Sequence, residues 1–374
     1  MRILIFNWKD IKHPLHGGAE IATQRFAEEL VKRKHTVTLF TSKPGRLKNE
    51  EVINGVSIIR RGNSQTVYFY ACLFYLTKLK AQTDLIIDQI HGIPFFTCFY
   101  VKKPILAYIH EIAADIWFKT FPFPIALLGK LFEPVFLSWY KHIPFLCDSP
   151  STAYELQQRG IVDTTVIPLT IDSSKKYKHF NKTAFTSIVY IGSISEVKQI
   201  DLLVEAMSIL KNQFPAIRLY LGGRAKPQQL TKIKNSVEKL NLTKQIQILG
   251  EVSEREKYKY YSQSWLHVQP SLKEGFGLTV LEAASVKTPT ICFNVPGLAE
   301  SVGKIDVSLV VPEMTAQSLA QTITTLLNNP QKIKQLSDVA YQWSKGLPTW
   351  EQQTKRLEHL LMRLTSSRNL YRLC

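Results

Sequence analysis

The sequence has few features of a disulfide-stapled, secreted or membrane-spanning protein. Its five cysteines are odd in number, scattered and never spaced as Cys-x-x-Cys, which argues against a disulfide framework and against a structural zinc site. The apolar run after Met1-Arg2 is too short for a signal peptide. No apolar run reaches the ~20 residues that a spanning helix requires. We therefore expect a globular, cytoplasmic protein.

The sequence also lacks the common signatures for nucleotides and metals. Neither G-x-G-x-x-G nor G-x-x-x-x-G-K-[ST] occurs, so there is no dinucleotide fingerprint and no P-loop. His13, His16 and Glu20 are spaced closely enough to suggest metal ligands, but they fall in and beside a loop that contains two glycines. We expect no metal and no cofactor.

The chain has an excess of positive charge. Its 374 residues carry 47 Lys and Arg against 30 Asp and Glu, a formal net charge of +17. Such a field favours a phosphate-rich ligand, a nucleic acid or an anionic membrane, and charge alone does not choose among them. The length predicts two domains, each large enough to bury its own core.

Short apolar segments alternate with helical patterns through the first 172 residues. A buried strand at 2–6 is followed by a glycine-containing loop and a helix over 19–34. This alternation predicts an α/β fold with a doubly wound parallel sheet. Further strands are expected at 36–40, 85–87, 105–109, 144–147 and 165–167.

The alternation resumes after a lysine-rich polar segment, residues 173–183, which we interpret as a linker. The sequence thus predicts two Rossmann-like domains, 1–172 and 184–350, facing a central cleft that binds ligands at the carboxyl ends of both sheets. A C-terminal helix, 351–374, is expected to pack back on the first domain. The strands of the second domain are expected at 187–191, 217–221, 246–249, 266–269, 290–293 and 308–311.

The most informative stretch is residues 270–284, where a strand ends, a loop turns and a helix begins near Leu278. Gly277 lets a ligand approach the backbone closely. The amides around Leu278 and Thr279, together with the positive end of the helix dipole, form a natural site for a diphosphate.

Two carboxylates frame this loop. Glu274 lies within it and Glu282 lies in the helix that follows, so the two can accept hydrogen bonds from two parts of one long ligand. Hydroxyl-rich sugars supply such donors, and the stretch therefore predicts a sugar-nucleotide site.

Other candidate residues also follow predicted strands. His110 comes directly after residue 109, at a strand's carboxyl end. Lys198 lies in the first loop of the second domain, where its ammonium group can neutralise a departing diphosphate. Arg224 ends another strand after two glycines, and the amides of Gly17 and Gly18 are expected to approach a phosphate ahead of the first helix.

An aromatic stretch at residues 117–140 has two interpretations. Its side chains can form ordinary core, or they can lie in a membrane interface with Lys119, Lys130 and Lys141 at the headgroups. The basic composition is compatible with both.

Taken together, these residues resemble family 4 of the retaining, nucleotide-sugar-dependent glycosyltransferases, which have the GT-B architecture. The Glu-x7-Glu element at 274–282 is the specific marker, and the likeness spans nearly the whole chain. The supporting markers are Gly17-Gly18-Ala19-Glu20, His110, Ile167-Pro168 before Ile171-Asp172, Gly192 with Lys198, Gly222-Gly223 and Trp350.

The resemblance implies a role for each matching residue. Glu274 would hold the donor sugar, Glu282 would take the ribose hydroxyls, and His110 would orient the sugar or assist at the reacting centre. The implied catalytic set is His110, Glu274 and Lys198, and the implied donor-binding set is Gly17, Gly18, Ser193, Lys198, Arg224, Phe276, Gly277, Leu278, Thr279 and Glu282.

Two departures from the family pattern bear on the site. Ser193 stands where the family often has an arginine, so stabilisation of the leaving group would rest on Lys198 with help from Arg224. Gln199 replaces a glycine that usually follows the lysine.

The function implied is metal-independent transfer of a sugar from a UDP- or GDP-sugar to a glycan or lipid-linked acceptor, in cell-envelope or exopolysaccharide biosynthesis. Binding to an anionic membrane surface at its cytoplasmic face is an expected extension. The alternatives are a nucleotide-sugar epimerase of the same architecture and a non-catalytic protein that binds sugar nucleotides or nucleic acid. No nucleic-acid-binding motif is present, so we expect no nucleic-acid partner.

Overall fold

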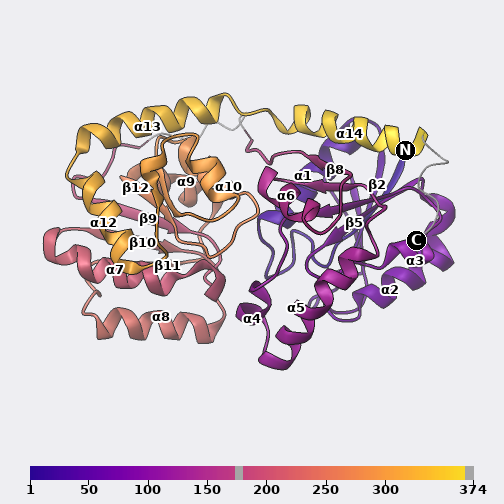
Figure 1. Cartoon of the computed structure of the whole chain (residues 1–374), viewed down its shortest axis with the longest axis horizontal. Helices are drawn as coiled ribbons and strands as arrows, with labels where there is room; N and C mark the ends of the chain where they lie inside the picture. Colours follow the sequence, from indigo (N-terminus) through magenta and orange to yellow (C-terminus); the bar gives the residue numbers. More distant parts are fainter. Residues whose placement is uncertain (173–179, 367–374) are drawn as a thin grey trace. The chain divides into compact units, whose positions relative to one another are not determined.

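The computed structural model describes residues 1–172 and 180–366, which form two compact α/β units (Figure 1). The first unit is residues 1–169 together with the chain from Pro348 onward, and the second is Thr170–Leu347. Residues 173–179 of the expected linker and 367–374 of the expected C-terminal helix lie outside the described residues. At the end of the linker segment, the Phe180 backbone amide donates to Ser262 Oγ of the second unit over 2.8 Å.

The first unit is built on an eight-stranded sheet of order β3-β4-β2-β1-β5-β6-β7-β8. Every residue of β1 after Arg2 is buried, as expected for a central strand covered on both faces. The strands are β1 (Arg2–Phe6), β2 (Thr36–Thr41), β3 (Glu50–Ile53), β4 (Val56–Arg60), β5 (Leu85–Ile90), β6 (Ile105–Ile109), β7 (Phe145–Cys147) and β8 (Thr164–Val166).

This sheet is parallel, as the sequence predicts, except at one edge. Strands β3 and β4 pair antiparallel at its edge, with Glu50 opposite Ile59 and Ile53 opposite Val56. They are joined by Asn54 and Gly55, which both have positive φ values, 49° and 85°. An Asn-Gly pair between short strands is a strong hairpin signal, so this element was readable from the sequence.

Helix α14 completes the first unit by packing against α1 (Figure 1). The Phe26 and Trp350 rings meet edge to face at 5.2 Å. Glu358 of α14 accepts hydrogen bonds from Arg33 Nε at 2.7 Å and pairs with His35 Nε2 at 2.8 Å. The helices of this unit are α1 (Gly18–Lys32), α2 (Val67–Phe74), α3 (Thr97–Tyr100), α4 (Ile116–Thr120), α5 (Phe123–Ser138), α6 (Pro150–Gln157) and α14 (Trp350–Ser366), with a π-helical turn at Tyr75–Leu79 and a 3-10 turn at Lys80–Gln82.

The second unit holds a six-stranded parallel sheet of order β11-β10-β9-β12-β13-β14. The expected strand at 308–311 is shorter than predicted, because Val307–Leu309 form a 3-10 turn before β14. The strands are β9 (Ser187–Ile191), β10 (Arg218–Gly222), β11 (Ile246–Gly250), β12 (Leu266–Gln269), β13 (Thr290–Phe293) and β14 (Val310–Val311).

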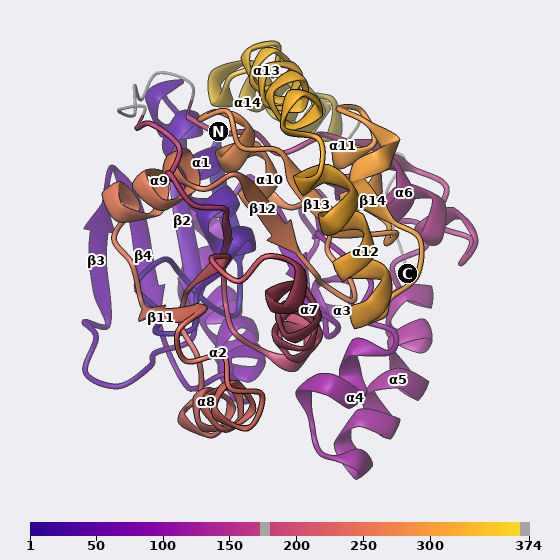
Figure 2. The ribbon, with the colours of Figure 1, turned by 90° about the vertical axis from the view of Figure 1, so that its left-hand side faces the viewer.

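Helices cover both faces of this second sheet. Ile188 and Tyr190 of β9 face the larger core with α7 and α12, which pack side by side (Figure 2). Val189 and Ile191 point the other way, toward Tyr258 of α9 and the α10 region. The elements are α7 (Ile200–Gln213), α8 (Pro227–Lys239), α9 (Glu254–Gln263), α10 (Leu278–Ala284), α11 (Leu298–Val302), α12 (Ala316–Leu327) and α13 (Pro330–Lys345), with a 3-10 turn at Glu196–Lys198.

Candidate functional site

Three loops meet at the carboxyl edge of the second sheet, after the neighbouring strands β10, β9 and β12. Ile194 N donates to Arg224 O at 2.7 Å, which joins the β9 loop to the β10 loop. Leu272 N donates to Val197 O at 2.8 Å, which joins the β9 loop to the β12 loop. The parallel sheet and these backbone bonds therefore bring the predicted donor residues of this unit into one region.

Lys198 and Glu274 form an ion pair in this region. Their side chains are 18% and 22% exposed, so the pair is largely withdrawn from water but still reachable. The Glu274 carboxylate also lies near Gln269 Nε2 at 3.5 Å and Ser271 Oγ at 3.4 Å. A ligand that carries hydroxyls and a phosphate can replace both halves of this pair.

The turn into α10 requires glycine. Gly277 caps the helix at φ +86°, and a Cβ there would lie 2.6 Å from Leu298 Cδ2. Gly297, which the sequence reasoning missed, packs so closely that a Cβ would lie 2.3 Å from the Glu274 carbonyl oxygen. The first amides of α10, at Leu278 and Thr279, have no acceptor one turn back within the helix, as at every helix start.

The remaining residues of this loop have distinct surroundings. Phe276 packs half-buried against the large core. Thr279 Oγ1 lies 3.3 Å from Gln269 Oε1, which ties the start of α10 to the end of β12.

Glu282 lies one turn further along α10 and pairs with Lys257 of α9 at 2.5 Å. Both side chains are less than one-fifth exposed. Lys257 was not predicted, because it sits in a charged run on a helix and nothing in its spacing distinguishes it from its neighbours. The two predicted carboxylates thus each carry a lysine partner.

Ser193 and Arg224 have surroundings that the sequence did not indicate. Ser193 is exposed, and its backbone carbonyl accepts a hydrogen bond from Tyr190 OH at 2.7 Å. Arg224 Nε lies 3.0 Å from Glu251 Oε1, in a pair whose carboxylate is 65% exposed. Arg224 must leave or share this partner if it is to meet a phosphate.

In the first unit, His110 follows β6 and is held by Asp148, which follows the neighbouring strand β7. The distance from His110 Nδ1 to Asp148 Oδ2 is 2.5 Å, and Tyr108 OH donates to Asp148 Oδ1 at 2.7 Å. Burial lowers the pKa of His110, but the charge and hydrogen bond of Asp148, together with the charges of Glu20 and Glu111, raise it, so the net pKa lies above the ordinary value. Asp148 was not predicted.

His110 belongs to a row of three neighbouring rings at this edge. Its ring lies 5.7 Å from that of His91, whose ring lies 5.4 Å from that of Trp8. His110 Nε2, His91 Nε2 and Trp8 Nε1 are buried and have no hydrogen-bond partner within the described residues. Because buried polar atoms are normally paired, three such nitrogens indicate a place for a polar ligand or water. Burial and then the charge of His110 hold the pKa of His91 well below its ordinary value.

Gly17 and Gly18 lie at the start of α1, as predicted from the sequence. The Gly17 amide donates to Glu20 Oε2 at 2.6 Å, so this amide already has an anionic partner. His16 Nδ1 lies 2.9 Å from the His13 carbonyl oxygen. Among residues 1–172 and 180–366, no group of three or more His, Cys, Asp or Glu side chains is arranged to hold a metal ion.

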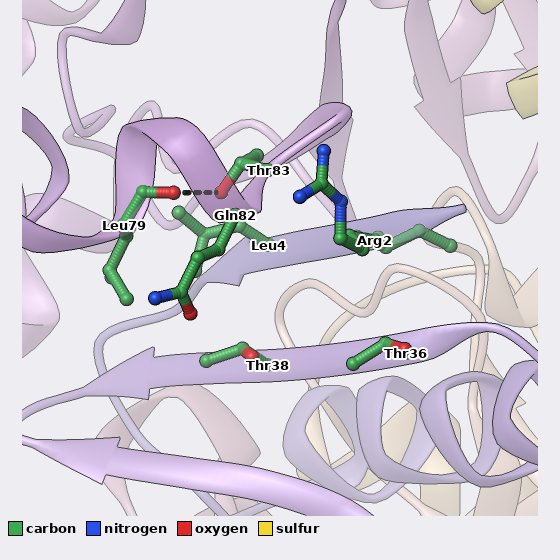
Figure 3. A pocket seen from close by; sticks show the side chains of 8 residues that line it. Arg2, Leu4, Thr36, Thr38, Leu79, Gln82 and Thr83 are labelled. Carbon is green, nitrogen blue, oxygen red and sulfur yellow. Dashed lines mark hydrogen bonds between the residues drawn. The ribbon is translucent and has the colours of Figure 1, made fainter.

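A separate pocket lies at the opposite, amino-terminal edge of the first sheet (Figure 3). Of the described residues that line it, the only charged one is Arg2, which pairs with Asp84 at 2.6 Å. Thr83 Oγ1 donates to the Leu79 carbonyl oxygen at 2.8 Å (Figure 3). None of the predicted site residues lies here, and we assign this pocket no function.

Known proteins resemble the chain over both units. The model of the glycosyl transferases group 1 matches residues 172–343, and that of glycosyltransferase family 4 matches residues 16–175. An uncharacterized glycosyltransferase of Methanocaldococcus jannaschii is 28% identical over 175 residues, 46% of each chain. The chain spans less than half of the length of the curated relatives it matches.

Solved structures share the fold across almost the whole chain. Sucrose-phosphate synthase from Thermosynechococcus elongatus has a TM-score of 0.82 at 20% identity and covers 98% of this chain and 99% of its own. The Anabaena protein HepE, solved in complex with UDP and glucose, has a TM-score of 0.75 at 16% identity and covers 97% and 100%. The two family models together reach from residue 16 to residue 343, and the chain belongs to the group 1, family 4 glycosyltransferases with the GT-B fold.

Proposed function

We propose that this protein transfers a sugar from a UDP- or GDP-sugar to an acceptor hydroxyl, with retention of the anomeric configuration. The observation that carries the proposal is the pair of lysine–carboxylate contacts, Lys198–Glu274 and Lys257–Glu282, on the loop and helix at 274–282. The hydroxyl groups of a sugar diphosphate donate hydrogen bonds to a carboxylate, and its phosphate oxygens accept them from an ammonium group. Each contact supplies one carboxylate and one ammonium group.

The donor exchanges partners with these residues as it binds. Lys198 turns from the Glu274 carboxylate to the diphosphate, and Glu274 accepts hydrogen bonds from the sugar hydroxyls. The amides of Leu278 and Thr279 donate to the diphosphate, where the dipole of α10 adds positive potential. Glu282 accepts from the ribose hydroxyls.

Further residues complete the donor set. Phe276 and Gly277 bring backbone amides to the sugar. Ser193 and Arg224 line the phosphate side, and Arg224 supplements Lys198 there after release from Glu251. The Gly18 amide donates to the phosphates. The Gly17 amide does the same once Glu20, its present acceptor, has moved away.

His110 acts on the sugar through Nε2, the ring nitrogen that Asp148 does not hold. Asp148 raises the pKa of His110, and in the protonated ring Nε2 donates a hydrogen bond to a sugar hydroxyl. Asp148 is a positioning residue, since it acts only through His110.

The reaction replaces one bond at the anomeric carbon with another and moves one proton. The acceptor oxygen attacks the anomeric carbon on the face from which the diphosphate leaves, the bond from that carbon to the diphosphate oxygen breaks, and the acceptor proton passes to a phosphate oxygen. Lys198 and the α10 amides stabilise the charge on the leaving diphosphate, so the proposal requires no metal.

The acceptor we propose is a glycan or a lipid-linked sugar used in building the cell envelope or an exopolysaccharide, at the cytoplasmic face of a membrane. Support comes from the net charge of +17, which favours anionic surfaces and phosphate-bearing lipids.

The test is a product assay in the presence of a chelator, with a panel of UDP- and GDP-sugars and mixed glycan and lipid-linked acceptors. We expect acceptor-dependent release of UDP or GDP and a product with the donor's anomeric configuration by NMR. Conversion of the donor sugar without nucleotide release would instead identify an epimerase. Donor binding without either product would identify a non-catalytic binding protein.

A further inference from the structure

Helix α5 presents an apolar surface to solvent. The chain has 24 large hydrophobic side chains that are exposed among the described residues, and ten of them lie within residues 118–139. These ten define the α4–α5 apolar surface: Phe118, Phe121, Phe123, Ile125, Leu127, Leu128, Leu131, Phe132, Val135 and Trp139. Scattered exposed apolar residues are ordinary, but a cluster of this density marks an interaction site.

The inward face of α5 is fully accounted for by the fold. Ala126, Glu133 and Leu137 are buried at helical spacing. Gly129 lies on the same side, where a Cβ would stand 2.2 Å from the Trp117 ring of α4. These buried residues pack α5 on the first unit, while most of the apolar side chains on its other side remain exposed.

The exposed charges around this surface are predominantly positive. Asp115, at the N-cap of α4, is an exposed carboxylate that pairs with Lys130 at 2.6 Å. The only acidic residue of α5, Glu133, is 3% exposed and faces inward, where its oxygens accept from the amides of Ala113 and Ala114 at 2.8 Å each. Lys130 and Lys141 are exposed beside the apolar residues. Lys119, Lys130 and Lys141 thus outnumber Asp115 among the exposed charged side chains from residue 115 to residue 142.

The apolar surface extends beyond α5 to α3. The Phe99 ring, 59% exposed, contacts the Trp139 ring at 5.2 Å. Lys102 and Lys103, just after α3, are also exposed. Aromatic and aliphatic side chains bordered by lysines are the composition of a helix that lies in a membrane interface.

We propose that the α4–α5 apolar surface docks the first unit onto an anionic lipid bilayer, with α5 in the plane of the interface. At 1.5 Å per residue, its 16 residues make a contact about 24 Å long. Within the described residues, no helix combines the length and apolarity needed to cross a bilayer, so the attachment is peripheral. This inference deepens the proposed function, because it supplies the means by which a lipid-linked acceptor is reached.

Vesicle sedimentation tests the surface with the full chain. Vesicles of phosphatidylcholine with phosphatidylglycerol should bind the wild type, and vesicles of phosphatidylcholine alone should bind it less. The triple variant Leu128→Gln, Leu131→Gln, Val135→Gln should bind at least about tenfold more weakly, because it removes three exposed apolar side chains from one stripe of the helix. Circular dichroism and the melting temperature should stay unchanged, since all three positions are exposed.

A matched control removes as many exposed apolar residues elsewhere. Val162→Gln, Val307→Gln, Val339→Gln alters positions that are 77%, 78% and 46% exposed and outside the surface, and it should bind vesicles as the wild type does. Lys119→Gln with Lys141→Gln should weaken binding to the anionic vesicles on the order of tenfold. The loss of binding in this lysine variant measures charge attraction, whereas the loss in the Leu128-Leu131-Val135 variant measures apolar insertion.

Three outcomes would overturn the proposal: no vesicle binding by the wild type, undiminished binding by the Leu128-Leu131-Val135 variant, or equal loss in the control. A wild-type dimer that this variant dissociates, seen by sedimentation velocity without vesicle binding, would assign the surface to a second copy of the chain. Nucleoside diphosphate binding is measured in parallel. Its absence alongside intact vesicle binding would refute the proposed function and leave the docking surface standing.

Discussion

Replacing Asp148 by asparagine should reverse the direction of the His110 pKa shift. The Asp148 carboxylate sits 2.5 Å from His110 Nδ1, and both side chains are at most 10% exposed. Burial already lowers the pKa of His110, and Asp148 is the main group that raises it. In Asp148→Asn the charge is gone, and we expect the pKa of His110 to fall from above 6.5 to below it.

The same change should lower stability in a pH-dependent way. Removing one partner of a buried ion pair costs about 3 kcal/mol of unfolding free energy. Because the pKa of His110 is raised in the folded chain, the stabilisation is fully present below pH 6.5 and is lost as the pH rises through the folded-state value. The difference between wild type and variant should therefore be largest in mild acid and shrink toward alkaline pH.

Proton NMR of the histidine rings measures the pKa, and His110→Gln assigns the signal among the nine histidines. Tyr108→Phe is the control, because it removes the other hydrogen bond to Asp148 and leaves the carboxylate charge in place. A His110 pKa that is the same in wild type and Asp148→Asn would refute the reasoning. A downward shift in Tyr108→Phe as large as that in Asp148→Asn would also do so.

Three further predictions concern stability, each measured by urea denaturation. Gly223→Ala should cost more than about 3 kcal/mol, because a Cβ would lie 1.6 Å from the Gly192 carbonyl oxygen at φ +143°; an unchanged midpoint would contradict this. Desolvation lowers the pKa of Lys182 to about 7, so wild-type stability should rise from pH 7 toward pH 10.5, and Lys182→Met should remove that rise. Glu358→Gln should lower the free energy of unfolding by about 3 kcal/mol at neutral pH, because it breaks the contacts to Arg33 and His35. These contacts hold the pKa of Glu358 below its ordinary value despite burial. The difference in stability between wild type and variant should therefore fade as the pH falls below 4.5.

The alternation of strands and helices was readable from sequence because it depends on local periodicity. Apart from β4 and the shortened β14, the parallel strands appear where apolar runs predict them, and α10 begins at Leu278 as expected. The β3–β4 hairpin was missed although Asn54-Gly55 signals it, because its flanking strands are only partly apolar and were not recognised as strands. The shortened β14 reflects Asp306, whose side chain accepts from Ser308 N at 2.8 Å and starts a 3-10 turn instead.

Only part of the site could be predicted from the sequence. The residues of the Glu-x7-Glu element lie close in sequence, so their spacing carries the information. Asp148 lies 38 residues from its partner His110 in the sequence, and Lys257 lies 25 residues from its partner Glu282. Strand order and helix packing bring these residues together, and no local sequence pattern predicts such contacts. They follow only from the tertiary structure.

Gln199 shows how a departure from the family pattern is absorbed. It stands where a glycine is usual, and it adopts a left-handed conformation, which ordinarily favours glycine, at φ 49° and ψ 40°. Its side-chain Nε2 donates to the Glu196 carbonyl oxygen at 2.8 Å, which helps to hold the turn. The turn after Lys198 is thus formed without a glycine.

Calorimetric titration of UDP and GDP into the full chain, with a chelator present, tests the central claim most directly. We expect one of the two nucleotides to bind at a single site. Glu282→Gln should weaken this binding by about tenfold or more, because charge-assisted hydrogen bonds to the ribose are lost. Glu238→Gln, which changes an exposed carboxylate of α8, should leave the binding unchanged. Failure of the folded wild type to bind either nucleotide, or equal binding by Glu282→Gln, would contradict a sugar-nucleotide site at the start of α10.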